Sequence, residues 1–459
     1  MGRLTRKGEV NLSGVFGIFS KNSNSVSQII YYGLFALQHR GQISCGIAIN
    51  NNGFLDYHKD LGLVHEVFSK DIFDRLRGNM GIGHVKYASS HEEQTQTNTE
   101  PVVMGYKKGA FALAFDGSIV NSNELRDKLK ESNTVLQSDL DAEVIANVIA
   151  KNQCADLEDA LNKTLNEIIG SYSLLLMTND MLIGARDPNG LKPLSLGKLG
   201  DDYVLASESC AFDAIGGDFV RDIEPGEVVL INDNGIKTIS KNFSERRPCL
   251  FELVYFARSD SFMDGKSIYR SRIEVGKQLA RESQIDGDIV IGAPDSGIVF
   301  AIGYAEESKI PYAEGMIKNR YVGRTFIQPS QELREQGVRI KLNVLKENIE
   351  GKKVILVDDS IVRGTTIKRT VDMLREAGAK EIHVRIASPP VLYPCHLGMD
   401  TPSKDNLISA NMEAEEIREL IGVDSLYFLT LEGLLKAIGN NGFCKGCFTG
   451  EYAVEEGKK

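Results

Sequence analysis

Short apolar runs and apolar–polar alternation recur through the first half of the chain, a pattern typical of strands buried on one or both faces. The pattern predicts strands at 14–19, 47–50, 80–84, 111–115, 172–177, 182–185 and 203–207. Helical spacing of apolar residues predicts a helix through Ile30 and Leu37, and helices over 123–131 and 142–150. Asp233-Asn234-Gly235 predicts a hairpin turn, and 242–248 is a candidate domain boundary. We therefore expect a β-rich layered domain in this half.

The second half alternates strand and helix patterns. Apolar strands are expected at 288–292, 354–357 and 381–387, separated by helices over 298–307 and from about Thr365 to Gly378. Successive strand–helix–strand units form a parallel sheet with helices on its faces. This half is therefore expected to be a doubly wound α/β domain.

The stretch 354–366, VILVDDSIVRGTT, joins a buried strand to two acids and a hydroxyl-rich glycine turn. Amides at a helix start, with the Thr365 and Thr366 hydroxyls, can coordinate a phosphate, and Gly364 lets the backbone approach it closely. Asp358 and Asp359, at the carboxyl end of the strand, can hold Mg²⁺ or accept hydrogen bonds from sugar hydroxyls. The acids alone would also fit a solvated turn, and Gly-Thr-Thr alone would fit a helix cap. The whole string indicates a phosphorylated sugar as ligand.

Composition and charge narrow the class of protein. The length of 459 residues suggests two or three domains, and 42% hydrophobic with 25% charged residues is ordinary for a soluble globular protein. A net charge of −10 disfavours nucleic acid as the main partner. The sequence contains no apolar run near the roughly 20 residues of a membrane helix, and its N-terminus lacks a signal-peptide core. We expect a cytoplasmic enzyme with no membrane partner.

The seven cysteines are odd in number and accompany no export signal, which argues against a disulfide framework. Three are isolated in the first half, and four lie in the second half: Cys45, Cys154 and Cys210, then Cys249, Cys395, Cys444 and Cys447. Four thiolates suffice for a structural zinc ion or an iron–sulfur cluster, but a lone CxxC pair leaves metal binding open.

Several strings resemble known families. The stretch 354–366 resembles the 5-phosphoribosyl-1-pyrophosphate (PRPP) signature of type I phosphoribosyltransferases. Strings from both halves resemble the glutamine PRPP amidotransferase family: SGVFGIFS, LQHRGQ, GIGHVKYAS, ARDPNGLKPLSLG, ASESCAFD, YFARSDS, GAPDSG, KNRYVGRTFIQPSQ and SPPVLYPC. The resemblance implies an α/β chain with an Ntn-hydrolase-type αββα glutaminase-like domain over 13–240 and a type I phosphoribosyltransferase domain over 250–452. It also implies synthesis of 5-phosphoribosylamine for purine biosynthesis, and a homodimer or homotetramer.

The resemblance assigns residues to PRPP, to Mg²⁺ and to a flexible basic loop. The PRPP residues that it implies are Asp295, Ser296, Gly297, Asp358, Asp359, Ser360, Arg363, Gly364, Thr365 and Thr366. Ser296, Asp358 and Asp359 would also meet Mg²⁺. Lys318, Arg320 and Arg324 would stabilise the departing pyrophosphate from a loop that closes over PRPP, although three cations in seven residues also fit a solvated basic loop.

The resemblance also resolves the cysteines. One subset of the family binds a [4Fe–4S] cluster through a Cys after the glutaminase domain, a Cys after Ser-Pro-Pro, and a C-terminal CxxC. Cys249, Cys395, Cys444 and Cys447 occupy these positions. The reaction has no redox step, so the cluster is expected to act as a structural clamp.

The glutaminase half departs from the family at three positions. Ser13 stands where the family has a nucleophilic Cys that becomes N-terminal after a leader is removed. Asp116 replaces an Asn that donates to the oxyanion, and Lys86 replaces an Arg that clamps the glutamine carboxylate. Asp141 matches the acid that holds the glutamine amine. We expect glutamine hydrolysis to be weak or lost, and Cys45 to be a buried cysteine rather than a substitute nucleophile.

Four functions remain open at this stage. The first is transfer of the phosphoribosyl group to ammonia, which arrives free or from a separate donor protein. The second is transfer to another small nucleophile, which Ser259, in place of a family Pro, keeps open. The third is full glutamine-dependent activity, and the fourth is a non-catalytic PRPP or nucleotide sensor. The sequence does not decide whether the leader 1–12 is removed.

Overall fold

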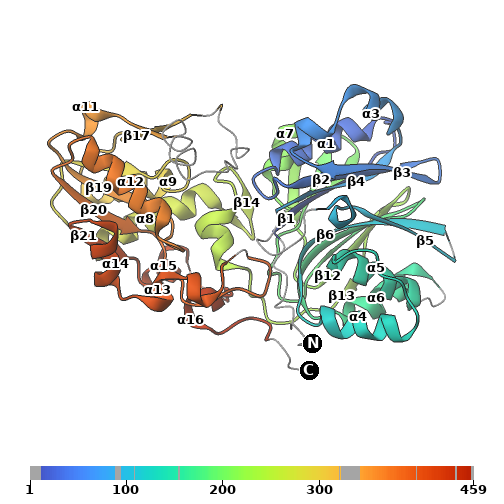
Figure 1. The fold of residues 1–459 in the computed structure, drawn as a ribbon. Coiled ribbons are helices and arrows are strands. Elements are labelled where there is room, and N and C mark those ends of the chain that lie inside the picture. The colour runs from blue at the N-terminus through green and yellow to red at the C-terminus, as the bar shows by residue number, and fades with distance from the viewer. Residues whose placement is uncertain are drawn as a thin grey trace.

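A computed structural model describes residues 12–87, 95–107, 109–152, 156–319, 321, 342–399, 401–439 and 442–455. Cys154, Arg320 and Arg324 lie outside these residues. Two domains lie side by side, the first coloured blue to green and the second yellow to red (Figure 1). The α/β organisation expected from the sequence is confirmed in both.

The first domain contains two antiparallel sheets. In spatial order, the seven-stranded sheet consists of β11 (Asp218–Asp222), β9 (Ser195–Leu199), β10 (Asp202–Ala206), β1 (Ser13–Phe19), β4 (Met80–Lys86), β2 (Ser44–Asn51) and β3 (Phe54–Leu61). The six-stranded sheet consists of β13 (Gly235–Lys241), β12 (Glu227–Asn232), β8 (Leu182–Arg186), β7 (Gly170–Met177), β6 (Gly109–Ile119) and β5 (Val102–Tyr106).

Side-chain alternation sorts these strands into layers. In β6, Phe111 and Leu113 pack toward the helices, whereas Ala112 and Ala114 pack toward the other sheet. The helices of this domain are α1 (Val26–Ala36), α2 (Val64–Val67), α3 (Lys70–Arg75), η1 (Gln96–Asn98), α4 (Ser122–Glu131), α5 (Asp141–Lys151), α6 (Leu157–Glu167) and α7 (Cys210–Ile215). With α1 and α7 on one sheet and α4, α5 and α6 on the other, the layers form an αββα sandwich (Figure 1).

The second domain is built on a parallel sheet. Its strand order is β16 (Ile289–Gly292), β19 (Lys353–Asp358), β20 (Glu381–Ile386) and β21 (Ser425–Phe428). Residues of odd and even number in β19 pack on opposite faces: Ile355 and Val357 face α8 (Ile268–Glu282) and α9 (Ile298–Ser308), and the even residues face α12 (Thr365–Glu376) and α14 (Ala414–Ile421). The sheet is therefore covered on both sides, as a doubly wound fold requires.

Shorter elements complete the second domain. They are the π-helix η2 (Glu252–Phe256), β14 (Phe262–Met263), β15 (Lys266–Ser267), β17 (Met316–Lys318), β18 (Leu342–Val344), α11 (Lys346–Ile349), η3 (Lys404–Asn406), α13 (Ile408–Asn411), α15 (Leu431–Ala437) and α16 (Gly446–Thr449). Among the described helices, none combines the length and the apolar character needed to cross a membrane.

The two domains share apolar packing. Leu12, directly before β1, is 5% exposed and belongs to the same cluster as Leu250, Met399 and Phe448 of the second domain. Its carbonyl accepts a 2.9 Å hydrogen bond from the Tyr87 amide. The residue before Ser13 is thus buried where the domains meet.

Candidate functional site

Two loops meet at the carboxyl ends of β16 and β19. These strands pair in parallel, with Gly292 opposite Val357, so the loops that follow them start side by side. The Ser296 hydroxyl donates a 2.9 Å hydrogen bond to Asp358 Oδ1 across 62 residues of sequence. A Cβ on Gly297 would lie 2.2 Å from the Val357 carbonyl oxygen, so only glycine permits this approach. The structure therefore brings together two stretches that the sequence singled out separately.

The acidic pair at this point is buried. Asp358 is 9% and Asp359 is 4% exposed. Burial raises the pKa of both carboxyl groups, and the charge of Asp359 raises the pKa of Asp358 further. The hydroxyls of Ser296 and Ser360 and the charge of Arg272 oppose this shift at Asp359. A bound cation would favour the ionised form of both groups.

The turn after the acidic pair opens α12. Gly364 has φ +76°, in the left-handed region, and Thr365 is the first helical residue. Arg363, Thr365 and Thr366 are exposed at this helix start, where backbone amides point outward. On the other side, the Lys318 ammonium lies in contact with the Asp295 carboxylate. Positive and hydrogen-bonding groups therefore belong to both of the loops that meet at the acidic pair.

The four second-half cysteines gather at the C-terminal segment. All four are free thiols. The backbones of Cys249 and Cys444 form an isolated parallel β-bridge, in which the Leu250 amide donates to the Cys444 carbonyl at 3.1 Å. Burial raises the pKa of Cys447, and the charges of Cys249, Cys395 and Cys444 raise it further. Burial raises the pKa of Cys395 to about 11, against the lowering effect of the Leu397 amide and the Lys192 charge.

This grouping bears on which metal group would fit. Within the described ranges, no three or more His, Cys, Asp or Glu side chains are grouped so that they could hold a metal ion. A cubane spaces its thiolates more widely than a single ion does, because each thiolate binds a different iron. Cys447 is buried and the other three thiols are half-buried, and a set of four thiolates is the donor set that an iron–sulfur cluster takes.

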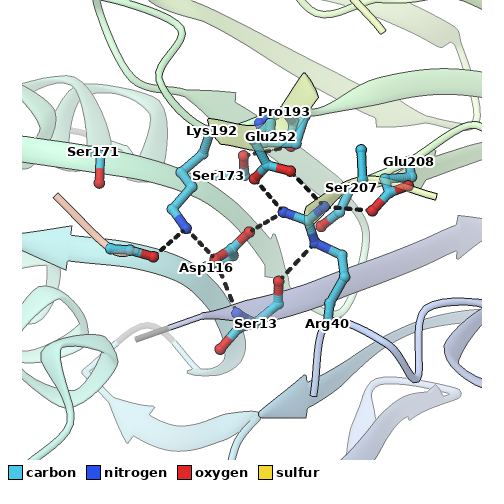
Figure 2. A network of polar contacts seen from close by, with 12 residues as sticks. Ser13, Arg40, Asp116, Ser171, Ser173, Lys192, Pro193, Ser207, Glu208 and Glu252 are labelled. Atoms are coloured by element: carbon cyan, nitrogen blue, oxygen red, sulfur yellow. Dashed lines mark hydrogen bonds and ion pairs between the residues drawn. The ribbon is translucent and has the colours of Figure 1, made fainter. Parts of the chain in front are cut away.

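A buried ionic network lies at the start of β1 (Figure 2). Asp116 Oδ1 accepts from the Ser13 amide at 3.2 Å and lies 3.1 Å from Lys192 Nζ, and Asp116 Oδ2 is 3.5 Å from Arg40. Arg40 also pairs with Glu208 at 2.5 Å and with Glu252 of η2 at 2.7 Å. Burial alone would lower the pKa of Arg40, but the Glu252, Glu208 and Asp116 carboxylates raise it overall. The network therefore spans both domains.

The remaining predicted residues of the first domain lie near this network. Lys86 is the β4 partner of Ser13, is 3% exposed, and donates to the Asn98 carbonyl at 3.3 Å. Asp141 accepts from the Ile119 amide at 2.9 Å and from the Ser122 hydroxyl at 2.5 Å. Cys45 is fully buried, as expected.

Sequence reasoning missed the cations and acids that connect the domains, namely Arg40, Lys192, Glu208 and Glu252. The only local signal was a charged residue inside the apolar strings around Arg40 and Lys192, and such residues are usually exposed. Their partners are far away in sequence, so spacing could not identify them.

Comparisons with known proteins cover both domains. Residues 87–214 match the glutamine amidotransferase domain family, and residues 260–388 match the phosphoribosyl transferase domain family. The amidophosphoribosyltransferase of Archaeoglobus fulgidus is 47% identical over 450 residues, covering 96% of this chain and 98% of the relative. That of Bacillus subtilis is 48% identical over 452 residues, covering 96% of this chain and 94% of the relative.

A solved structure agrees with these matches. The glutamine PRPP amidotransferase of B. subtilis, complexed with ADP and GMP, superposes with a TM-score of 0.91 at 48% identity. The superposition covers 96% of this chain and 98% of that chain.

Proposed function

Because this chain belongs to the amidophosphoribosyltransferase family, we propose that it transfers the 5-phosphoribosyl group of PRPP to ammonia. In this reaction the bond from C1 of ribose to pyrophosphate breaks, a C1–N bond forms, and ammonia gives up a proton. The products are 5-phosphoribosylamine and pyrophosphate, which makes the protein a cytoplasmic enzyme of purine biosynthesis. The observation that carries the proposal is the hydrogen bond from Ser296 to Asp358, because it joins the pyrophosphate loop to the sugar-phosphate loop.

We assign the roles of the second domain accordingly. The helix start at Gly364, Thr365 and Thr366, with Ser360 and Arg363 beside it, would hold the 5-phosphate. Asp358 and Asp359 would accept hydrogen bonds from the ribose hydroxyls, and the loop of Asp295, Ser296 and Gly297 would meet the pyrophosphate. Ser296, Asp358 and Asp359 are the oxygen donors suited to Mg²⁺, which when bound would neutralise pyrophosphate charge.

Lys318 supports a role for the basic loop. Its ammonium reaches Asp295 in the pyrophosphate loop, so this cation can stabilise the negative charge that builds on the leaving group. Arg320 and Arg324, outside the described residues, would add to this charge and exclude water.

We propose further that Cys249, Cys395, Cys444 and Cys447 bind a [4Fe–4S] cluster. Their free, half-buried to buried thiols and their mutual electrostatic effect support it. The bound cluster would supply a covalent clamp between the domain boundary and the C-terminal segment. Protein purified without oxygen should be brown, with about four irons per chain, and colourless iron-free protein would contradict the assignment.

Glutamine hydrolysis is proposed to be weak or lost. Ser13 Oγ is buried, and among the described residues it has no hydrogen-bond partner to act as a base. If the leader is retained, the Ser13 nitrogen is a peptide amide and has no basic lone pair. If the leader is removed, Asp116 at 3.2 Å would hold the new amine as an ammonium ion. In either state the first domain lacks a base at Ser13.

The oxyanion would also be poorly stabilised. An ionised Asp116 accepts hydrogen bonds and repels a second negative charge, and loss of one oxyanion donor alone costs roughly 3 kcal/mol. Lys86 keeps a positive charge but lacks the two-pronged geometry of an arginine. Asp141, with both oxygens in hydrogen bonds of its own domain, does not compensate.

One set of incubations tests the proposal against its alternatives. With PRPP, Mg²⁺ and ammonium, the protein should release pyrophosphate and form phosphoribosylamine, whereas glutamine should replace ammonium poorly. Brisk glutamate release would instead favour the full glutamine-dependent enzyme. Pyrophosphate only with another acceptor would favour a different nucleophile, and PRPP binding without turnover would favour a sensor.

We assign residues 13–240 to the glutaminase-like domain and 250–452 to the transferase domain. The family also suggests a homodimer or homotetramer, and lost glutaminase activity would call for free ammonia or a separate ammonia donor. Size-exclusion chromatography with light scattering would measure the assembly.

A further inference from the structure

The segment from Cys395 to Met399 is fastened to the first domain by two side chains. The Ser171 hydroxyl of β7 donates to the Leu397 carbonyl at 2.7 Å, and Lys192 Nζ donates to the Gly398 carbonyl at 2.9 Å. Leu397 in turn points its amide at Cys395 Sγ, 3.3 Å away. The backbone that presents this cysteine is therefore held from outside its own domain.

Lys192 is itself held by Asp116. The ammonium lies 3.1 Å from Asp116 Oδ1 (Figure 2). The Lys192 backbone amide donates to the Asp187 carboxylate at 3.0 Å. Asp116 is fully buried and Lys192 is 2% exposed, so water cannot replace either partner. A buried ammonium without a counter-charge would be strongly disfavoured. Asp116 is therefore the group that allows a charged lysine to sit behind the cysteine segment.

The shape of the segment matches this contact. Gly398 has φ +90°, and a Cβ there would lie 2.8 Å from Lys192 Cε and 3.0 Å from Nζ. The positive φ favours glycine at this position, and any larger residue would have to displace the end of the Lys192 side chain. The glycine backbone therefore packs closely against the lysine side chain in the interior of the protein.

We propose that Asp116 and Lys192, with Ser171, are positioning residues for the cysteine site: they fix the Cys395–Met399 segment and so hold Cys395 ready for its metal group. This inference rests on the cluster proposed above. It gives a role to the same Asp116 that removes the oxyanion donor from the glutaminase-like site, and it connects that site to the cysteines through the chain Asp116, Lys192, Gly398 and Cys395.

The test compares how fast the cluster is lost from variants of the full chain. Lys192→Met removes the contact to Gly398, and Ser171→Ala removes the contact to Leu397. Loss of a hydrogen-bonding partner behind a metal ligand typically costs 10- to 100-fold in metal affinity. We therefore expect the cluster of Lys192→Met to lose its colour in air at least tenfold faster than that of the wild type. Absorbance and iron per chain are the readouts. Bleaching of both single variants at the wild-type rate would overturn the inference.

A double variant separates the contact from the buried charge. Lys192→Met alone leaves Asp116 with one cation fewer, which destabilises the whole fold. Asp116→Asn with Lys192→Met removes both charges, so its melting temperature should recover toward the wild-type value while bleaching stays fast. If bleaching also recovers, the lysine acts only through overall stability and the inference is wrong.

Glu227→Gln is the matched control. Glu227 is 1% exposed and pairs with Arg221 at 2.7 Å inside the first domain, in contact with no residue of the Cys395–Met399 segment that we describe. This variant should lower the melting temperature but keep the wild-type bleaching rate. Wild-type protein without iron would refute the cluster and this inference together, whereas iron-loaded wild type with unchanged variants would refute the inference alone.

Discussion

Replacing Asp358 by Asn should stabilise the ligand-free protein while removing its response to PRPP. Asp358 and Asp359 are adjacent and buried, and burial together with the Asp359 charge raises the pKa of Asp358. Ionising these two carboxyl groups therefore costs more free energy in the folded protein than in the unfolded chain. Asn keeps the shape and removes one of the two ionisable groups.

The size of the effect follows from the surroundings. Relieving one incompletely paired buried charge is worth about 2 kcal/mol, which would raise the Tm of a domain of about 200 residues by about 4–8 °C. The Ser296 hydroxyl, which hydrogen-bonds Asp358, already offsets part of the cost. The lower end of that range is therefore expected.

The pKa shift of Asp358 also predicts how the stability gain of the Asn variant changes with pH. An acid with a raised pKa in the folded state contributes stability below its unfolded pKa of about 4, and this contribution is lost as pH rises through the folded value. The Tm gain of Asp358→Asn should thus be small near pH 4 and grow toward neutral pH. Asp372→Asn, at an exposed position of α12, should show no such trend.

Thermal melts between about pH 4 and pH 8, with and without Mg²⁺ and PRPP, measure both the stability change of the ligand-free protein and its response to PRPP. Wild type should gain Tm with the ligand, and Asp358→Asn should not. A variant that melts below the wild type at neutral pH, or a gain independent of pH, would refute the electrostatic reasoning.

Three further changes address other parts of the second domain. Gly297→Ala should cost about 1–3 kcal/mol in a urea melt, because its Cβ would meet the Val357 carbonyl at 2.2 Å; an unchanged midpoint would contradict the close approach. Lys318→Met should lower kcat with PRPP and ammonium about 100-fold at nearly constant Tm, and wild-type turnover would exclude its role at the leaving group. Ser259→Ala should lose about 1 kcal/mol because the hydroxyl lies 3.0 Å from the Arg272 guanidinium, whereas Ser259→Thr should keep the stability if that hydrogen bond matters.

Local pattern predicted the buried strands well. β1, β6 and β7 are almost entirely buried, so their apolar residues stand out in the sequence. β3, which was not predicted, is exposed or half-buried along its whole length and carries charged residues between its few apolar ones. Its strand conformation is fixed by pairing with β2 along the full register, which a local window cannot detect.

The site residues likewise fall into those that a local stretch of sequence could predict and those that it could not. Residues 354–366 were predictable because strand, acids, turn and helix start are contiguous. The hydrogen bond between Ser296 and Asp358 depends on the parallel register of β16 and β19, and the ion pair of Arg40 with Glu252 joins residues 212 apart. Such contacts follow from topology. The resemblance to a family assigned Ser296 and Asp358 to one Mg²⁺ site but predicted neither contact.

The two halves of the chain share one apolar cluster and one buried ionic network. Leu12 completes an apolar cluster of the second domain, and Arg40 places its charge against a helix of that domain. Two fragments made by splitting the chain between the domains would each expose part of this cluster and would lose the pair between Arg40 and Glu252, so we expect them to be less stable apart than together. The front half is therefore expected to contribute to the stability of the back half, whether or not it hydrolyses glutamine.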